Sequence, residues 1–174
     1  MYRTSSLLAA VLAAGCASTQ SASSIIPEQL NPGAKESMTL IVPAKGVQIY
    51  ECRESKDKPG AYEWTFVAPE AQLFDTTGKP IGRHYAGPSW ESSDGSKIAG
   101  AVKARADAPS ANAIPWLLLG TKSVGTDGSF SKVTSIQRVN TVGGVAPKVG
   151  CSQDNAGTPA RIPYAADYYF FTAK

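Results

Sequence analysis

The side chains best suited to chemistry in this sequence are concentrated between residues 82 and 96. This stretch holds the only histidine of the chain, one of its three tryptophans and two acidic side chains among glycine and proline breaks. Imidazole is a common general base and metal ligand, and aromatic rings form platforms for ligands. We therefore expect a ligand-binding surface in this stretch. Its candidate residues are His84, Tyr85, Trp90, Glu91 and Asp94.

A divalent metal at His84 is one interpretation of this group. A single histidine does not make a usual transition-metal site, so a carboxylate such as that of Asp94 would have to act as co-ligand. The other interpretation is that His84 fixes a turn through hydrogen bonds. The sequence therefore predicts no definite cofactor and leaves a divalent metal at His84 and Asp94 open.

Hydrolytic chemistry has weaker support. Several serines lie near His84, but no Gly-x-Ser-x-Gly nucleophile elbow is present. Carboxylates scattered along the chain could meet in space for polysaccharide hydrolysis, although no spacing favours this. The catalytic residues stay unassigned, and the sequence favours a non-enzymatic protein over an enzyme.

Two further side chains have alternative interpretations. Trp90 lies among Pro, Ser, Glu and Asp, a composition typical of a loop. Its side chain is therefore as readily expected in an exposed or rim position as in a buried one. Arg138 lies in a run of β-branched residues, where it could form an ion pair with Asp167 or Glu70, or could recognise an anion.

The elements that must position these residues are strands. From Met38 onward, short apolar runs rich in Val, Ile, Tyr, Trp and Phe are separated by turn residues, including one turn expected at 43–46. Tyr62, Trp64 and Phe66 alternate with polar residues, which predicts a strand with one buried aromatic face. The pattern predicts an all-β, single-domain antiparallel sandwich or small barrel of about eight to ten short strands.

Two runs are apolar at successive positions, 114–119 and 164–171, and both are candidates for buried strands. Three segments place glycine after polar residues between β-rich runs, as hairpin turns require. These segments are 75–78, 93–96 and 126–129.

The N-terminus has the features of an export signal. Arg3 precedes an apolar run at 7–14 that is too short to span a bilayer. The end of this run, LAAGC at 12–16, resembles the lipobox of bacterial lipoproteins, in which the cysteine is acylated. We therefore expect a signal peptide at 1–16 with lipidation at Cys16; plain signal cleavage is the alternative.

The expected domain organisation follows from composition. Residues 17–37 are rich in Ser, Ala, Gln and Pro and are predicted to be a flexible tether, and 38–174 are predicted to be the all-β domain. The basic residues are scattered singly, so nucleic acid is not an expected partner. If Cys16 carries the anchor, an even pair remains, and we expect a disulfide between Cys52 and Cys151.

Seven segments, in order, carry a resemblance to a known family, together with His84 and Cys151. They are GVQIYEC (46–52), PEAQL (69–73), GPSW (87–90), DGS (94–96), IPWLLL (114–119), IQRVNT (136–141) and IPY (162–164). The chain resembles the secreted proteins of bacteria and filamentous fungi that share domain of unknown function 3455. The resemblance implies a secreted setting and assigns no activity.

Taken together, these features favour an exported, lipid-anchored envelope or extracellular binding module. Its expected partners are a membrane, through the lipid anchor, and a small-molecule, glycan or metal ligand. Lipidation would place it at the outer membrane or in the periplasm, and the unlipidated protein would be secreted. The alternatives are a metal-dependent or carboxylate-based polysaccharide hydrolase and a structural surface protein.

Overall fold

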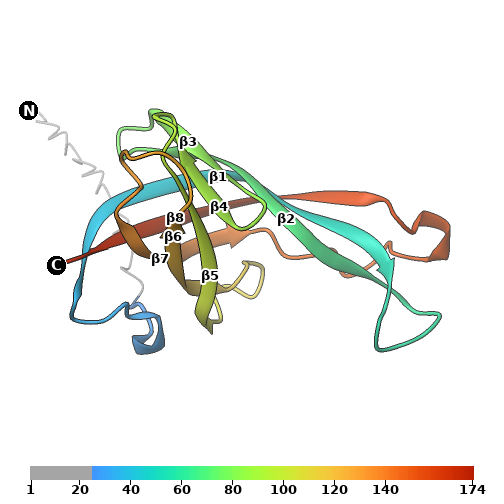
Figure 1. Ribbon diagram of the computed structural model, residues 1–174. Helices are drawn as coiled ribbons and strands as arrows, with labels where there is room; N and C mark the ends of the chain where they lie inside the picture. Colours follow the sequence, from blue (N-terminus) through green and yellow to red (C-terminus); the bar gives the residue numbers. More distant parts are fainter. Residues whose placement is uncertain (1–24) are drawn as a thin grey trace, which may run out of the picture.

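The protein is a closed barrel of eight antiparallel strands (Figure 1). The computed structural model describes residues 25–174, so the predicted signal peptide and Cys16 lie outside it. Each strand pairs with its neighbours in the sequence, and the last strand closes the sheet by pairing with the first. The all-β prediction is confirmed, and of its two architectures the protein adopts the barrel.

The strands and two short 3-10 helices follow one another along the chain with no long helix among them. They are η1 (Glu28–Leu30), β1 (Glu36–Glu54), β2 (Tyr62–Phe74), β3 (Pro80–Tyr85), β4 (Ser89–Ser92), β5 (Lys97–Ala106), β6 (Trp116–Ser123), β7 (Val133–Gly143), η2 (Gln153–Asn155) and β8 (Pro159–Ala173). No helix among these described elements is long and apolar enough to cross a membrane.

Three of the strands are longer than the short strands we predicted. β1, β2 and β8 have 19, 13 and 15 residues, and Figure 1 shows their far ends extending beyond the rest of the sheet as a ribbon. The turn expected at 43–46 is instead part of β1. A Cβ on Gly46 would lie 2.1 Å from the carbonyl oxygen of Glu70, so this glycine permits close approach of β2 rather than a turn.

The barrel interior is filled by alternate residues of each strand, as the two-residue period of a strand requires. On β8, Tyr164, Ala166, Tyr168 and Phe170 are buried in the main core cluster. The 114–119 run is apolar at successive positions because β6 is covered on both faces. Its inward residues join this core, while Trp116 and Leu118 face a second cluster outside the barrel.

The second cluster is made by the segment before β1. Leu30 of η1 is fully buried against Trp116, Leu118 and Val139, and its carbonyl oxygen accepts a hydrogen bond of 2.7 Å from the Gln137 amide. We predicted that residues up to 37 belong to a flexible tether. Instead, Leu30 of η1 packs on the barrel wall by covering apolar side chains that β6 and β7 turn outward, and β1 already begins at Glu36.

The expected turns are present with one difference. Gly78 and Gly95 adopt positive φ in the β2–β3 and β4–β5 turns, as hairpin glycines do. The 126–129 segment belongs to a longer loop between β6 and β7. The aromatic face of β2 differs from the prediction, since Phe66 is 50% exposed and lies beside an opening in the barrel described below.

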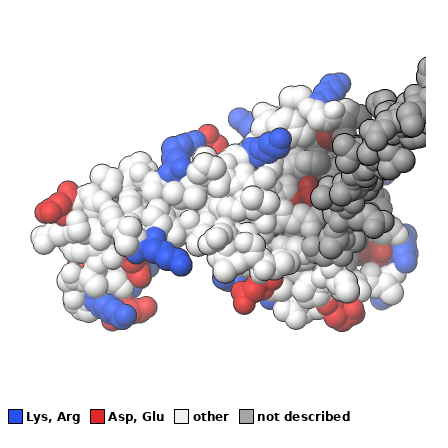
Figure 2. Space-filling model, turned by 180° about the vertical axis from the view of Figure 1, so that it is seen from behind, with Lys and Arg blue, Asp and Glu red and all other residues white. Residues whose placement is uncertain are grey.

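The predicted disulfide is confirmed. Cys52 near the end of β1 is bonded to Cys151 in the segment before η2, with a Cα–Cα distance of 5.3 Å. The bond lies in the extended ribbon, where β1 pairs only with β2 and β8. Figure 2 shows basic and acidic side chains interspersed over one face, separated by broad uncharged surface.

Candidate functional site

A cavity enters the barrel beneath the hairpin formed by β3 and β4. These two strands are shorter than β2 and β5 on either side, so the flanking strands continue past the hairpin tip at Gly87 and Pro88. The space between them holds a cavity of about 330 Å³. Such a volume falls at the lower end of the range for small-molecule sites.

Apolar side chains supply most of the cavity wall, and a few polar groups converge on it. The apolar lining consists of Phe66, Val67, Pro69, Pro88, Trp90, Val102, Leu117 and Leu119. The polar lining consists of Gln48, His84, Arg138 and Tyr168. This combination of apolar walls and few polar groups is typical of ligand sites.

Strand alternation divides the residues of the 82–96 cluster between the two faces of the sheet. In the β3–β4 register His84 is opposite Trp90, and Arg83 is opposite Glu91. His84 and Trp90 both line the cavity. Tyr85 and Glu91 contact each other apart from the cavity, so the five predicted residues do not form one site.

His84 is buried and uncharged. Its Nδ1 lies 2.9 Å from the carbonyl oxygen of Ser89, and because a carbonyl only accepts, Nδ1 carries the proton. Burial, together with the nearby Arg138 cation, lowers the pKa of His84 to about 3. The Nε2 atom is therefore a neutral hydrogen-bond acceptor on a ring that lines the cavity.

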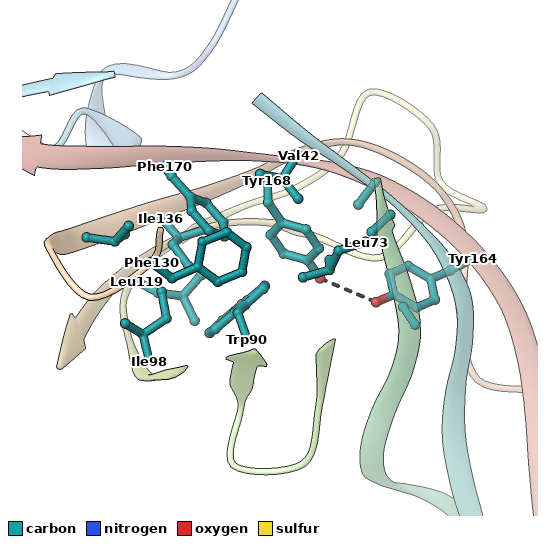
Figure 3. Packing of buried hydrophobic residues seen from close by; sticks show 14 of the residues in the cluster. Val42, Leu73, Trp90, Ile98, Leu119, Phe130, Ile136, Tyr164, Tyr168 and Phe170 are labelled. Carbon is teal, nitrogen blue, oxygen red and sulfur yellow. Dashed lines mark hydrogen bonds between the residues drawn. The ribbon is translucent and has the colours of Figure 1, made fainter. Parts of the chain in front are cut away.

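Trp90 is also buried, at 1% exposure, rather than exposed or at the rim. Its ring stacks on His84 at a centroid distance of 4.3 Å and meets Tyr168 edge-on at 5.5 Å. Gly100 on β5 leaves room for the indole, because a Cβ there would lie 2.8 Å from a Trp90 ring carbon. Figure 3 shows Trp90 beside Tyr168, whose hydroxyl points toward Tyr164.

Glu91 and Tyr85 form a polar group of their own. The Glu91 carboxylate accepts hydrogen bonds from the Tyr85 hydroxyl at 2.5 Å and from Arg83 at 2.9 Å. Both hydrogen bonds lower the pKa of Glu91, and the bond from Tyr85 has the larger effect. The contacts account for Tyr85 and Glu91 without a ligand.

Asp94 joins two loops rather than contacting His84. One carboxylate oxygen accepts from the backbone and hydroxyl of Ser96, and the other accepts from the backbone and hydroxyl of Ser129. These hydrogen bonds hold the pKa of Asp94 well below its usual range. Between residues 25 and 174 the structure brings together no group of three or more His, Cys, Asp or Glu side chains that could hold a metal.

Arg138 enters the cavity from β7 without the ion pair that the sequence suggested. Its Nε and Nη2 atoms donate to the carbonyl oxygen of Pro115 at 3.1 and 2.8 Å. Glu70 is paired with Arg161 at 2.7 Å, and Asp167 accepts from the amide of Asn140. Neither carboxylate that we considered as its partner therefore neutralises Arg138.

Gln48 is a cavity residue that the sequence did not single out. It is 2% exposed, and its Nε2 has no hydrogen-bond partner among the described residues. The sequence carried a signal, because Gln48 follows Val42 and Ala44 at the inward positions of β1 and interrupts their apolar pattern. Tyr168 was also missed as a site residue, since its apolar neighbours predict only a core strand.

Tyr164 and Tyr168 remain neutral in the interior. The hydroxyls of Tyr164 and Tyr168 lie 3.3 Å apart, and burial raises the pKa of both. The cavity thus offers hydrogen-bond donors, neutral acceptors and one cation. Its described lining contains no carboxylate, so the converging acidic groups that a carboxylate-based hydrolase needs do not meet at His84.

A family model described as "Protein of unknown function (DUF3455)" matches residues 32–172. The matched region begins just after η1 and includes every strand of the barrel except the last residue of β8. No curated protein matches the chain, and no solved structure does.

Proposed function

Since the chain belongs to the family of domain of unknown function 3455, whose description states no activity, we propose its function from the geometry of the barrel. The protein is an exported binding module that holds a small, largely apolar molecule in the cavity beneath the β3–β4 hairpin. The observation that carries this proposal is a preformed cavity with apolar walls and an apolar mouth.

The mouth of the cavity distinguishes it from an ordinary packing defect. Phe66, Val67 and Val102 line it and are 50%, 45% and 57% exposed. Exposing three large apolar side chains at one opening is unfavourable unless a bound molecule covers them. Further inside, His84 is held by a hydrogen bond and by stacking, and Trp90 is held by packing, so the cavity requires little ordering when a ligand enters.

Export and anchoring are further parts of the proposal. The Cys52–Cys151 disulfide supports an oxidising compartment. The signal-like N-terminus and the lipobox-like sequence ending at Cys16 support membrane attachment through an acyl chain. Expression of Cys16→Ser tests this: we expect the protein to move from the detergent phase to the aqueous phase in detergent partitioning, and unchanged partitioning would contradict anchoring at this residue.

Calorimetric titration with octanol tests the binding function, because octanol is neutral and small enough for the cavity. We expect saturable binding to the purified protein. Val102→Trp places an indole at the mouth and should abolish binding. The control is Val124→Trp, at a residue of equal exposure (56%) that does not line this cavity. Equal binding by both variants, or no binding by the unsubstituted protein, would contradict the proposal.

A further inference from the structure

We infer that the ligand of this cavity is a monocarboxylate with an apolar body, whose carboxylate binds Arg138 and Gln48. The inference rests on the proposed binding function and specifies its ligand. It follows from three features of the cavity: a cation with no acidic partner, a buried amide donor with no acceptor, and apolar walls leading to an apolar mouth.

The first feature is the charge of Arg138. The three ion pairs of the described residues join Arg53 to Glu51, Arg83 to Glu91 and Arg161 to Glu70, so none involves Arg138. A cation partly removed from water is unfavourable unless an anion compensates it. The Pro115 carbonyl orients the guanidinium and leaves N–H groups available for another acceptor.

The second feature is the amide of Gln48. Gln48 lines the cavity, and its buried Nε2 makes no hydrogen bond of ordinary geometry among the described residues, although the side chain lies close enough to the Tyr164 hydroxyl to lower the pKa of that group. An unmade hydrogen bond at a buried donor is costly, and native structures have few of them. A carboxylate has two oxygens, so it can accept from the guanidinium and from this amide at the same time.

The remaining polar lining discriminates between kinds of anion. His84 and Tyr168 are neutral, so among the described residues of the lining Arg138 alone is charged. One cation within apolar walls compensates a monoanion, whereas a phosphate dianion would keep an uncompensated charge. The ligand is thus expected to carry a single negative charge.

The third feature sets the size and shape of the ligand. Leu117 and Leu119 lie in the wall, and Phe66, Val67 and Val102 lie at the mouth. A cavity of about 330 Å³ holds on the order of ten non-hydrogen atoms if each occupies about the 30 Å³ of a water molecule. A straight-chain carboxylate of about eight carbons, with its chain directed to the mouth, matches this volume.

Calorimetry with octanoate, octanol and acetate tests the inference, using the purified protein near neutral pH. We expect octanoate to bind at least about tenfold more tightly than octanol, as charge-assisted hydrogen bonds predict. Acetate should not bind at millimolar concentration, because it has no body to cover the apolar wall. If octanol binds as tightly as octanoate, this inference is overturned while the proposed binding function stands; if neither binds, both fail.

Arg138→Met tests the assigned cation. It should reduce octanoate affinity at least about tenfold and lower the ratio of octanoate affinity to octanol affinity. Arg105→Met is the matched control, because it removes one positive charge at an exposed position outside this cavity. Arg138→Lys keeps the charge but not the planar fork and should give an intermediate octanoate affinity. If Arg138→Met does not fold, the Arg138→Lys variant provides the test. The ratio of octanoate affinity to octanol affinity should then be lower in this variant than in the unsubstituted protein, and equal ratios in the two proteins would contradict the role of Arg138.

Discussion

At the scale of single residues, the interior of this barrel contains more polar side chains than a packed core needs. His84, Gln48 and Arg138 occupy inward positions beside large apolar side chains. His84 has its proton on Nδ1 and is kept neutral by burial. Each of these side chains is held in a defined orientation or has a hydrogen-bonding atom without a partner among the described residues. Both features are expected of residues in a binding site.

The neutral state of His84 makes stability depend on pH. In the unfolded chain its pKa is near 6.5, and in the folded protein burial lowers it to about 3. Between these values the unfolded state binds the proton and the folded state does not. Its contribution to stability is therefore present above pH 6.5 and is lost as the pH falls toward 3.

We expect the free energy of unfolding to decrease by ~2 kcal/mol from about pH 7 to about pH 5, where most carboxylates are still ionised. Denaturant titrations at both pH values measure this difference. His84→Gln, which cannot take up a proton, should lose most of the dependence whatever its absolute stability. An unchanged dependence in this variant would show that other groups cause it.

At the scale of elements, the two-residue period of the strands decides which residues meet. The 82–96 stretch looked like one site in the sequence, but the β3–β4 register sends His84 and Trp90 into the cavity and Tyr85 and Glu91 to other contacts. The sequence predicted strands and turns here, but not which face of each strand would point inward. Asp94 could not be placed either, since its partner Ser129 comes from a distant loop.

The same period could have identified one more site residue. Gln48 is a polar interruption in the row of inward apolar residues on β1, whereas Arg138 was already a candidate for anion recognition. Local sequence did not reveal the cavity itself, because the opening depends on β3 and β4 being shorter than their neighbours. The long β1 strand was divided in the prediction because Pro43 and Gly46 look like turn residues, but both tolerate a continuous strand.

The η1 segment provides a prediction about elements. Leu30 is fully buried against β6 and β7, whereas Ile25, a few residues earlier, is 93% exposed. Leu30→Ala should decrease the free energy of unfolding by about 2–5 kcal/mol through a lost side chain and a cavity. Ile25→Ala, measured in the same denaturant titration, should have almost no effect. Equal stability of the two variants would mean that η1 does not pack on the barrel in solution.

At the scale of the whole molecule, the protein combines a compact barrel with a ribbon of three long strands. The barrel has a continuous interior core, whereas the ribbon is fastened by the disulfide between Cys52 and Cys151. The all-β class and this disulfide were predictable from composition and cysteine count. Closure into a barrel was not, because it depends on β1 pairing with β8 at the other end of the domain.

The disulfide should contribute strongly to the stability of the molecule. Its cysteines are separated by 99 residues, and closing such a loop stabilises the folded state by roughly 3–5 kcal/mol in the chain-entropy treatment. We expect the free energy of unfolding of the Cys52→Ala, Cys151→Ala double variant, measured by denaturant titration, to be lower by this amount. Hydrogen exchange should increase first in the ribbon, and uniform loss of protection across the barrel would contradict this division.

The central claim is that the cavity beneath the β3–β4 hairpin holds an apolar carboxylate. A crystal structure with octanoate labelled by bromine on its terminal carbon tests it most directly, since anomalous scattering locates the bromine. The predicted result is a carboxylate within hydrogen-bonding distance of Arg138 and Gln48, with the bromine near Phe66 and Val102. Bromine found only on the outer surface, with no octanoate in the cavity, would contradict the claim.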